Sequence, residues 1–412
     1  MELKAGFKKT EAGIIPEDWL VSPLGCLVDF LDGKRRPVKE SDRAKMQGSI
    51  PYYGASGIVD YVNDSIFDEN LILLGEDGEN ILSRSCRLAF RVSGKIWVNN
   101  HAHVLRPRPS IDIDFLSELL ESLNYEQYNS GTAQPKLNKQ TCSRIPVGHP
   151  PTKLEQQGIA QALSDADTLI ESLEQLIAKK RQIKQGAIQE LLTVKRRLPG
   201  FNHSWSKTQM KNELLQPATY GIVTSGTFVQ NGVKMLRGGD ISEGKINTNL
   251  PMVSYEKANE YSRTKLEKND VVIALVGYPG ESAKIPNELV GANISRAVGL
   301  LRLKPTLLPD FLVCYLNSPV GRRLVLAPSA GSAQQVVNLA ALNKLTFDIP
   351  NLEEQHVISE FFLAIDSEIS NLECKLDKAR QIKRGMMQEL LTGRIRLIDG
   401  LGKPETYAST AN

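Results

Sequence analysis

The feature that most constrains this chain is an internal repeat. Residues 181–193 read RQIKQGAIQELLT, and residues 380–392, which lie 199 positions later (380 minus 181), read RQIKRGMMQELLT. Ten of these thirteen positions are identical. The match continues upstream at the same offset in seven pairs: Pro151/Pro350, Glu155/Glu354, Gln156/Gln355, Ile159/Ile358, Asp167/Asp366, Leu173/Leu372 and Glu174/Glu373. The chain is therefore a tandem duplication, with each half about 200 residues long.

The amino-acid composition of each half changes at one place. Residues 1–150 and 200–349 are rich in Gly and Pro, and they contain short runs such as LAFRV and AVGLLRL, which predict strands separated by turns. Both regions are therefore predicted to be mixed α/β (α+β) domains. From Leu154 to Thr193, and from Glu353 to Thr392, Pro is absent and helix-forming residues dominate. Each of these segments is predicted to be one long helix.

The two predicted helices each carry an apolar seam. Spacings of four and three alternate at Ile159, Leu163, Ala166, Ile170, Leu173 and Ile177, and at Ile358, Phe362, Ile365, Ile369, Leu372 and Leu376. A period of 3.5 residues is typical of coiled coils. Because the second helix must run back along the first, we expect an antiparallel coiled coil and pseudo-twofold symmetric halves. The alternative is that each helix packs on its own domain.

These patterns predict a division of the chain into five segments. They are a first α/β domain (1–150), a central long helix (151–199), a second α/β domain (200–349), a C-terminal long helix (350–398) and a flexible tail (399–412).

Composition narrows the class of protein. The 412 residues are 41% hydrophobic and 24% charged, which is ordinary globular material, and the net charge of +3 neither requires nor excludes nucleic acid. The sequence has no run of eighteen apolar residues and no apolar core of a signal peptide near its start, so we expect a cytoplasmic protein. The five cysteines are scattered and never form a CxxC pair, which favours reduced thiols over a disulfide framework or a zinc cluster.

The layout resembles the specificity subunit of type I restriction-modification systems. The resemblance rests on the order of a variable domain, GTAQPKLN, PPTKLEQQGIAQAL and RQIKQGAIQELLT, followed by a second variable domain, GSAQQVVN, IPNLEEQHVI and RQIKRGMMQELLTGRIRL. It implies two target-recognition domains, each reading one half of an asymmetric, gapped sequence in double-stranded DNA. It also implies that the coiled coil sets the spacing between the halves.

The resemblance has further implications for partners and cofactors. It implies that the chain is not itself an enzyme, and that it scaffolds two adenine-N6 methyltransferase subunits, which restriction/motor subunits join. No cofactor is then expected on this chain, whereas S-adenosylmethionine, ATP and Mg are expected on the partner subunits. A specificity subunit of a related methyltransferase-only system, and a coiled-coil adaptor that does not bind DNA, stay open as alternatives.

Motifs for chemistry are missing from the sequence itself. No GxxxxGK[ST] loop is present, and no [DNS]PP[YFW] tetrapeptide of an adenine methyltransferase occurs; the nearest string is HPPT at 149–152. His101 and His103 could share a metal ion from one strand face, but no carboxylate or thiol lies at ligand spacing, so no metal site is predicted. We expect no catalytic residue in this chain.

Candidate DNA contacts combine cations with side chains that read base edges, in turns where glycine permits exposure. In the first half they are Lys34, Arg35, Arg36, Tyr52, Tyr53, Ser56, Asn99, Asn100, His101 and Gln134. In the second half they are Tyr220, Thr224, Ser225, Arg237, Tyr278, Ser282, Lys284, Arg296 and Gln334. For each one, a place in a turn or in the core is the alternative. Gln134 and Gln334 either contact the phosphate backbone or start the following helix.

The repeated helix ends suggest docking sites. A glycine inside a strong helix costs about 1 kcal/mol relative to alanine, yet one occurs at the same place in both repeats. We therefore expect another chain to approach closely at the two equivalent sets Arg181, Gly186 and Gln189, and Arg380, Gly385 and Gln388.

Overall fold

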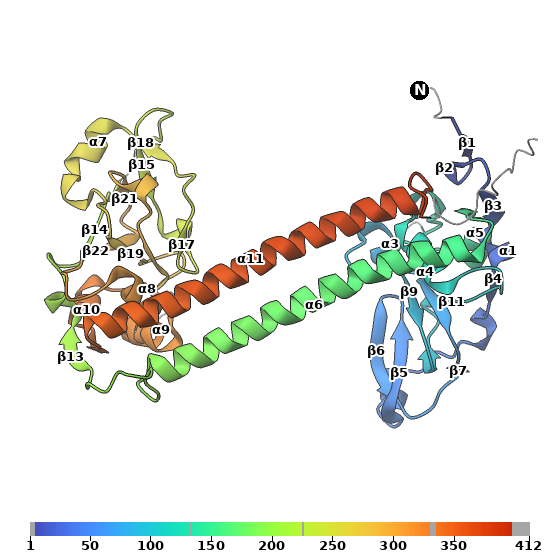
Figure 1. Cartoon of the computed structure of the whole chain (residues 1–412), viewed down its shortest axis with the longest axis horizontal. Helices are drawn as coiled ribbons and strands as arrows, with labels where there is room; N and C mark the ends of the chain where they lie inside the picture. Colours follow the sequence, from blue (N-terminus) through green and yellow to red (C-terminus); the bar gives the residue numbers. More distant parts are fainter. Residues whose placement is uncertain (1–4, 132–133, 225, 330–334, 398–412) are drawn as a thin grey trace, which may run out of the picture. The chain divides into compact units, whose positions relative to one another are not determined.

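The computed structural model describes residues 5–131, 134–224, 226–329 and 335–397 (Figure 1). It consists of two compact units. Unit 1 contains residues 1–174 and 374–412, and unit 2 contains residues 175–373. Each unit has one globular domain, called here the first and the second domain, together with parts of both long helices. The tail predicted at 399–412 lies outside the described residues.

The first domain consists of short elements. Its strands are β1 (Phe7–Thr10), β2 (Gly13–Pro16), β3 (Leu20–Pro23), β4 (Val28–Phe30), β5 (Gln47–Gly54), β6 (Gly57–Val62), β7 (Phe67–Asp68), β8 (Leu71–Gly75), β9 (Ala89–Val92), β10 (Lys95–Val98), β11 (Ala102–Pro107) and β12 (Pro146–His149). Its helices are α1 (Leu24–Leu27), α2 (Glu40–Arg43), α3 (Asn80–Ser83), α4 (Ile113–Ser122) and α5 (Lys139–Ser143), with 3₁₀ turns η1 (Asp32–Lys34) and η2 (Glu126–Tyr128).

The second domain is built in the same way. Its strands are β13 (Ser206–Gln209), β14 (Thr219–Tyr220), β15 (Val233–Leu236), β16 (Ile241–Ser242), β17 (Lys245–Ile246), β18 (Met252–Val253), β19 (Val271–Ala274), β20 (Ser282–Lys284), β21 (Asn293–Ile294), β22 (Val298–Leu301) and β23 (Thr346–Ile349). Its helices are α7 (Tyr255–Glu260), α8 (Pro309–Asn317), α9 (Pro319–Leu326) and α10 (Leu339–Lys344), with 3₁₀ turns η3 (Met210–Asn212), η4 (Gly238–Asp240), η5 (Ser262–Thr264), η6 (Asn287–Leu289) and η7 (Ala327–Ser329).

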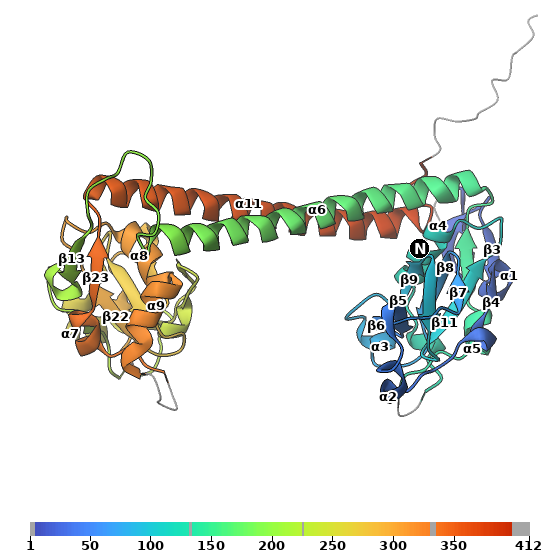
Figure 2. The same ribbon diagram turned by 90° about the horizontal axis from the view of Figure 1, so that it is seen from below.

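Sheet topology repeats the duplication. The order β4-β11-β8-β9 in the first domain corresponds to β14-β22-β19-β20 in the second. In each domain a neighbouring sheet contains one parallel pair, β5 with β10 and β15 with β21. A further two-stranded sheet, β12 with β3 or β13 with β23, lies next to the long helices (Figure 2). Both halves therefore present equivalent loops on one framework.

The long helices α6 (Lys153–Leu191) and α11 (Leu352–Leu390) confirm the two predicted helices. Each begins one residue before the predicted helical run and ends two residues before its end, inside the predicted segments 151–199 and 350–398. In unit 1 they are joined by two ion pairs. Arg380 Nη2 lies 2.6 Å from Glu174 Oε1, and Lys383 Nζ lies 2.5 Å from Asp167 Oδ2. Because the residue number rises along α11 as it falls along α6, the helices are antiparallel.

Unit 2 contains the same two pairs with the partners exchanged. Arg181 Nη2 lies 2.6 Å from Glu373 Oε1, and Lys184 Nζ lies 2.5 Å from Asp366 Oδ1. Each residue is the repeat equivalent of one in unit 1, at the offset of 199 (366 minus 167). The duplicated helix therefore pairs with its own copy, and the predicted antiparallel arrangement is confirmed within each unit.

Residues of the apolar seam pack in two different places, at the helix ends in the globular cores and in the middle of the helices outside those cores. The first two positions of the seam belong to globular cores: Ile159 and Leu163 pack in the first domain with Leu390 and Leu391 from the end of α11. The second domain repeats this packing with Ile358, Phe362, Leu191 and Leu192. The later positions belong to neither core, and those on α11, Ile365, Ile369, Leu372 and Leu376, are buried. The coiled-coil prediction therefore holds for the middle of each helix, and packing on a domain holds at the ends.

A buried glutamate ties the start of each helix to the segment that follows the other helix. Glu354, which is 1% exposed, receives two hydrogen bonds from Arg197, from Nε at 2.8 Å and from Nη2 at 2.6 Å, and one from Trp205 Nε1 at 3.2 Å. Glu155, 2% exposed, likewise accepts from Arg396 Nη2 at 2.8 Å and from Trp19 Nε1 at 3.3 Å. We call these two clusters the glutamate locks.

The next residue holds each helix to its own domain. Gln156 accepts a hydrogen bond from the Asp112 backbone N–H at 2.7 Å and donates to Pro150 O at 3.0 Å. Its equivalent Gln355 accepts from the Leu308 N–H at 2.8 Å and donates to Pro350 O at 2.9 Å. A buried amide that satisfies backbone groups of two segments fixes the angle at which a helix leaves its domain.

We predict that Glu354→Gln destabilises the second domain by on the order of 3 kcal/mol, because removing one partner of a buried ion pair leaves Arg197 without its counter-charge. Glu353→Gln is the matched control, since Glu353 lies in the same first turn of α11 and is exposed. That change should cost less than about 1 kcal/mol. Urea unfolding of the full chain measures both. Equal effects of the two variants would contradict the structural role assigned to the lock.

Candidate nucleic-acid interface

Four loops of the first domain are joined by backbone hydrogen bonds. The loop after β8 donates from Glu76 N–H to His101 O at 2.8 Å, and the segment 129–137 donates from Leu137 N–H to Glu76 O at 2.7 Å. Asn99 N–H, just after β10, donates to Tyr53 O at 3.0 Å, which brings in the turn between β5 and β6. These loops, which are 54–57, 75–79, 99–101 and the described residues of 129–137, form what we call the first loop cluster.

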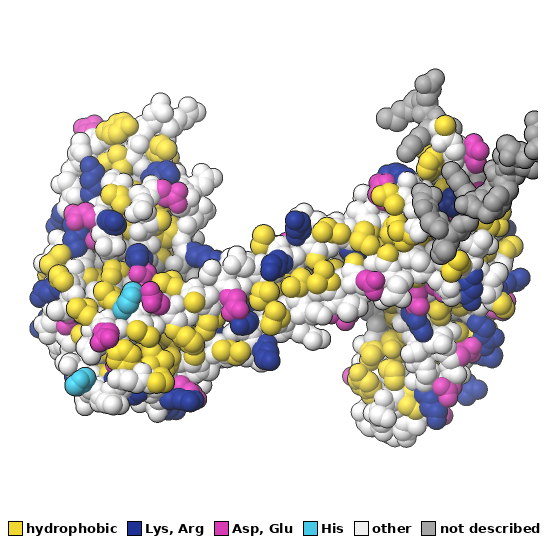
Figure 3. Space-filling view, in the orientation of Figure 1, with side chains coloured by type: hydrophobic (Ala, Val, Ile, Leu, Met, Phe, Trp, Pro, Cys, Tyr) yellow, Lys and Arg dark blue, Asp and Glu magenta, His cyan; other side chains and the backbone are white. Residues whose placement is uncertain are grey.

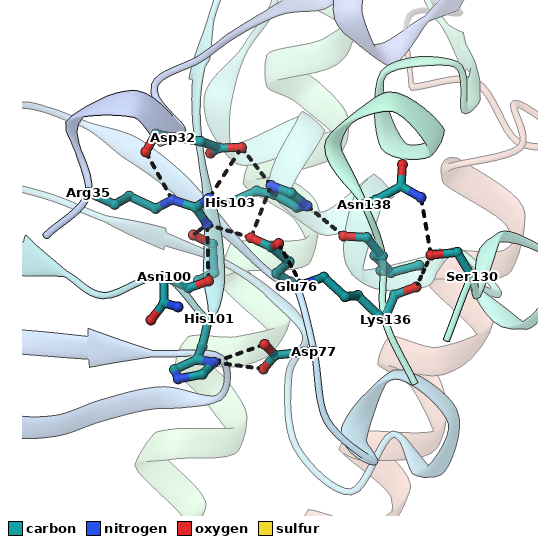
Figure 4. Close-up of polar contacts among 12 residues, drawn as sticks. Asp32, Arg35, Glu76, Asp77, Asn100, His101, His103, Ser130, Lys136 and Asn138 are labelled. Atoms are coloured by element: carbon teal, nitrogen blue, oxygen red, sulfur yellow. Dashed lines mark hydrogen bonds and ion pairs between the residues drawn. The ribbon is translucent and has the colours of Figure 1, made fainter. Parts of the chain in front are cut away.

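A polar network beneath the first loop cluster holds it together (Figure 4). Arg35 Nη1 donates to Glu76 Oε2 at 2.6 Å and to Ala102 O at 2.7 Å. His103 Nδ1 lies 2.8 Å from Asp32 Oδ2, while its Nε2 lies 2.8 Å from Leu137 O. Because both ring nitrogens face acceptors, the imidazole satisfies this geometry best when it carries two protons.

Electrostatics agrees with a charged His103. Burial by itself would lower the pKa of this imidazole, but contacts with Asp32 and Cys142 outweigh burial and raise its pKa from the usual 6.5 to about 10. Burial would raise the pKa of the Asp32 carboxyl, yet its hydrogen bond with His103 brings that pKa below its usual value. The pair is therefore a buried imidazolium and carboxylate that connects η1, β11 and segment 129–137.

Three of the predicted contact residues in the first domain point inward. Arg35 is 13% exposed and occupied by the network, and Tyr52 is 2% exposed with its hydroxyl accepting from the Val38 N–H. Asn99 is 8% exposed, and its side chain accepts from the His101 N–H at 2.8 Å. Packing and internal hydrogen bonds account for these three side chains, which corrects their prediction as exposed DNA contacts.

The other candidates of the first domain lie at its surface or close to it. Tyr53 is half-buried, and the exposed ones are Lys34, Arg36, Ser56, Asn100, His101 and Gln134. His101 Nδ1 lies 2.9 Å from Asp77 Oδ2, so the ring is oriented while half of its side chain stays exposed. Lys136, which the sequence analysis did not select, is 50% exposed and lies 3.4 Å from Glu76. The first loop cluster thus has a rim of mixed cationic and amide side chains.

The second domain builds the equivalent loop cluster. Ser295 N–H, after β21, donates to Leu236 O at 2.8 Å, and Leu275 N–H, after β19, donates to Ala297 O at 2.8 Å. Val337 N–H donates to Leu275 O at 3.0 Å, as Leu137 does to Glu76 in the first domain. The second loop cluster therefore comprises residues 237–240, 275–281, 295–297 and the described residues from 335 to 338.

Predicted residues of the second domain separate in the same manner. Ser282 is fully buried and bonded to Asn317, and Lys284 Nζ is paired with Asp310 at 2.6 Å, so both have structural partners. The exposed candidates are Tyr220, Thr224, Arg237, Tyr278 and Arg296. Ser225 and Gln334 lie outside the described residues.

The predicted docking residues are accessible on the helices. Arg181 and Arg380 are 65% and 50% exposed, each within an ion pair between α6 and α11, and Gln189 and Gln388 are exposed. A Cβ atom added to Gly186 or Gly385 would meet nothing within 4 Å. No packing within the described chain therefore requires a glycine at either place.

We also looked for a strongly charged surface, a metal-binding group of side chains and a membrane-spanning helix. On the face drawn in Figure 3, Lys and Arg are interspersed with Asp and Glu over both domains. Within the described residues, no group of three or more His, Cys, Asp and Glu side chains could hold a metal ion. In the same part of the chain, no helix is long and apolar enough to cross a membrane.

Comparison with known families identifies the repeat. A model described as "Type I restriction modification DNA specificity domain" matches residues 16–183 and again residues 201–379, well over half of the chain. The chain belongs to this family. Two copies of a DNA specificity domain match the two halves found by duplication, and they give the chain a role in DNA sequence specificity.

Relatives and solved structures agree with the family. The type I restriction enzyme MjaVIII specificity subunit of Methanocaldococcus jannaschii is 26% identical over 95% of this chain and 96% of that protein. The Escherichia coli EcoBI specificity subunit is 30% identical over 47% of this chain and 41% of that protein. A crystal structure of the type I system S subunit from M. genitalium has a TM-score of 0.61 at 15% identity, covering 95% of this chain and 98% of that one, which shows the same fold.

Several residues that build the specificity domain escaped sequence reasoning. Asp32, Glu76 and His103 carry the first network, and Glu155 and Glu354 carry the locks. For the glutamates a signal existed, because they occupy a largely apolar helix face and repeat at the offset of 199. For the network no such signal existed, because its members come from distant segments.

A pH dependence follows from His103. Since its pKa is raised from 6.5 to about 10 on folding, its stabilising contribution is complete below about pH 6.5 and is lost as the pH rises toward 10. We predict that His103→Gln destabilises the first domain by about 3 to 5 kcal/mol near pH 6, and that its difference from wild type shrinks between pH 6.5 and 10.

Thermal unfolding of both proteins over that pH range measures the difference. His101→Gln is the control, because that ring pairs with Asp77 at the surface and should contribute less than about 1 kcal/mol. A difference between wild type and His103→Gln that stays constant from pH 6 to 10 would contradict a proton held by this pair.

Proposed function

We propose that the two domains each read one half of an asymmetric, gapped sequence in double-stranded DNA, and that α6 and α11 set the gap between the halves. The observation that carries this proposal is that one framework of loops is built twice with different exposed side chains. Asn100, in the loop after β10, corresponds to Arg296, in the loop after β21. Equal frameworks with unequal reading groups suit two different half-sites.

The exposed groups match the chemistry of DNA recognition. Arg, Asn, Gln and Tyr side chains at the loop clusters can donate to or accept from base edges, and Lys34, Arg36 and Lys136 can contact phosphates. The inward-facing network of Arg35 and His103 then has a supporting role, since it keeps the reading loops rigid. Rigid loops lose less conformational entropy on binding.

The helices suit a spacer. Each is continuous over 39 residues, which at ~1.5 Å per residue corresponds to roughly 60 Å of helix. The paired helices carry ion pairs at equivalent places, and the glutamate locks hold their ends. A length fixed in this way defines the number of base pairs between two readers.

The remaining parts of the proposal concern partners. The chain would serve as the non-catalytic subunit on which two adenine-N6 methyltransferase subunits assemble, with restriction/motor subunits joining through the complex. The partners would then bind S-adenosylmethionine, ATP and Mg. Gly186 and Gly385 support equivalent docking places, because the space above both is open and equal surfaces in both repeats suit equal partners.

Two alternative functions would need different structural features. The specificity subunit of a methyltransferase-only system would use the same readers and spacer, and it differs only in the absence of a restriction subunit. A coiled-coil adaptor that does not bind DNA has no need of two loop clusters on duplicated frameworks. The family match to DNA specificity domains in both halves favours the DNA reader.

Replacing residues 200–349 by the corresponding domain of another family member should change one half of the methylated motif only. The first domain keeps its own loop cluster, network and lock in such a chimaera, so its half-site should persist. Sequencing of methylated adenines in cells that express the chimaera with its methyltransferase subunits provides the measurement. The reciprocal replacement of residues 1–150 is the control and should change the other half. A change in both halves from either replacement would refute independent reading.

A further inference from the structure

The side chain of Arg237 is held in a fixed orientation at the second loop cluster. Its Nε donates to Asp240 Oδ2 at 3.0 Å, and its Nη2 donates to Asp240 Oδ1 at 2.9 Å. The backbone N–H of Arg237 donates to the same carboxylate at 2.9 Å. Three bonds to one carboxylate therefore fix both the start of the side chain and the plane of its guanidinium group.

Asp240 and Arg237 differ strongly in exposure. The Asp240 side chain is 6% exposed, whereas Arg237 is 49% exposed. The carboxylate thus faces the protein and the guanidinium extends toward solvent. A buried carboxylate needs a partner, and the arginine that supplies it here keeps about half of its surface in contact with solvent.

The turn that carries this pair packs tightly against two other segments of the second loop cluster, 275–281 and 295–297. A Cβ atom on Gly238 would lie 2.1 Å from Val276 O and 3.0 Å from Ala297 O. Gly238 is thus required by close backbone contact with the loops that present Tyr278 and Arg296. Arg237 is therefore placed by its neighbours as well as by Asp240.

The donors left on Arg237 have a specific pattern. A guanidinium has five N–H donors in a planar fork, and Asp240 engages the edge formed by Nε and Nη2. The opposite end still presents two parallel N–H groups, one on each Nη. Two parallel donors match O6 and N7 of guanine in the major groove, and no other base offers two adjacent acceptors there.

We propose that Arg237, positioned by Asp240, reads a G·C pair in the half-site of the second domain. This inference rests on the proposed function, and it adds the base that is read and the residue that reads it. Asp240 acts as a positioning residue, because it contacts the arginine and not the base. Cytosine presents a donor in the major groove and arginine has no acceptor, so Arg237 has no matching contact with cytosine at that place.

Two other arginines of the second domain, Arg302 and Arg296, lack this combination. Arg302 makes a similar fork with Asp270, with Nε and Nη2 both at 2.9 Å, but it is only 18% exposed and also contacts Glu267 and Lys265 O. Arg296 is exposed, and among the described residues no side-chain hydrogen bond or ion pair orients it. A side chain without a fixed orientation loses more conformational entropy when it reads one base than Arg237 does.

The test uses the full chain expressed with its methyltransferase subunits in cells whose methylated adenines are mapped. In Arg237→Gln we expect the first half-site and the gap to persist, while one G·C position of the second half-site becomes degenerate. Preference for guanine there should fall roughly 10- to 100-fold. Asp240→Asn should weaken preference at the same position to a smaller extent, because the arginine stays but loses its orientation.

Arg106→Gln is the matched control. Arg106 forms the same fork with Glu69, through Nε at 2.7 Å and Nη2 at 2.6 Å, and is 40% exposed. It lies in the first domain, near the end of β11 and away from the residues that join the first loop cluster. This variant should leave the second half-site unchanged, including its G·C position.

Each outcome decides between the two proposals. A gapped motif that keeps every preference of its second half in Arg237→Gln overturns the guanine assignment and leaves the proposed function standing. Absence of any gapped motif with the wild-type chain overturns both. If Arg237→Gln abolishes methylation, gel shifts of the purified complex follow, on the wild-type site and on sites in which each G·C pair of the second half-site is substituted in turn. Loss of the preference for guanine at one of these pairs supports the assignment, and a preference retained at every pair overturns it.

Discussion

The pairing of the repeated helix with its own copy is the constraint on which the rest of the structure depends. Arg380 with Glu174 and Arg181 with Glu373 are the same contact made twice. Exposed ion pairs of this kind contribute little to stability, about 0.2 to 1 kcal/mol each. Their value lies in register, because a shift of one helix along the other breaks the contacts in both units together.

The glutamate locks connect this register to the domains. Glu155 and Glu354 sit at the starts of α6 and α11, yet the arginines that bind them, Arg396 and Arg197, follow the opposite helix. The start of one helix and the end of the other are thereby held on one domain. Buried carboxylates need such partners, so a sequence that keeps the glutamate must also keep the arginine and the tryptophan.

Further contacts join the helices to the domains and support the reading loops. Gln156 and Gln355 join each helix to its domain, and the buried pair of His103 and Asp32 supports the first loop cluster from below. In the second domain close backbone contact at Gly238 has the corresponding effect. The frameworks are alike, and the exposed side chains differ. Specificity can therefore change at the rim without disturbing the spacer.

Much of this organisation could be predicted from the sequence, because repeats and heptads are visible in one dimension. The two long helices and their antiparallel pairing both follow from spacing. The direction in which a side chain points could not be predicted from the sequence. Arg35 and Lys34 are neighbours of the same chemical type, but Arg35 turns inward to Glu76 while Lys34 stays exposed. Only tertiary contacts from distant segments decide such a choice.

The packing of the helix ends could not be predicted from the sequence either. The seam residues Ile159 and Ile170 obey one pattern, but Ile159 packs in the core of the first domain whereas Ile170 lies outside it. Periodicity identifies an apolar face without naming what covers that face. The locks were hidden for a related reason, since a repeated glutamate does not identify its partner, which lies 241 residues from Glu155 and 157 residues from Glu354.

The most direct test of the central claim lengthens both helices equally. Four residues inserted after Leu173 and four after Leu372 add about 6 Å at ~1.5 Å per residue. With base pairs rising about 3.4 Å along the duplex, the gap in the methylated motif should grow by roughly one or two base pairs. Both half-sites should stay the same. An active variant whose gap is unchanged would contradict the account, because the paired helices would then not determine the spacing.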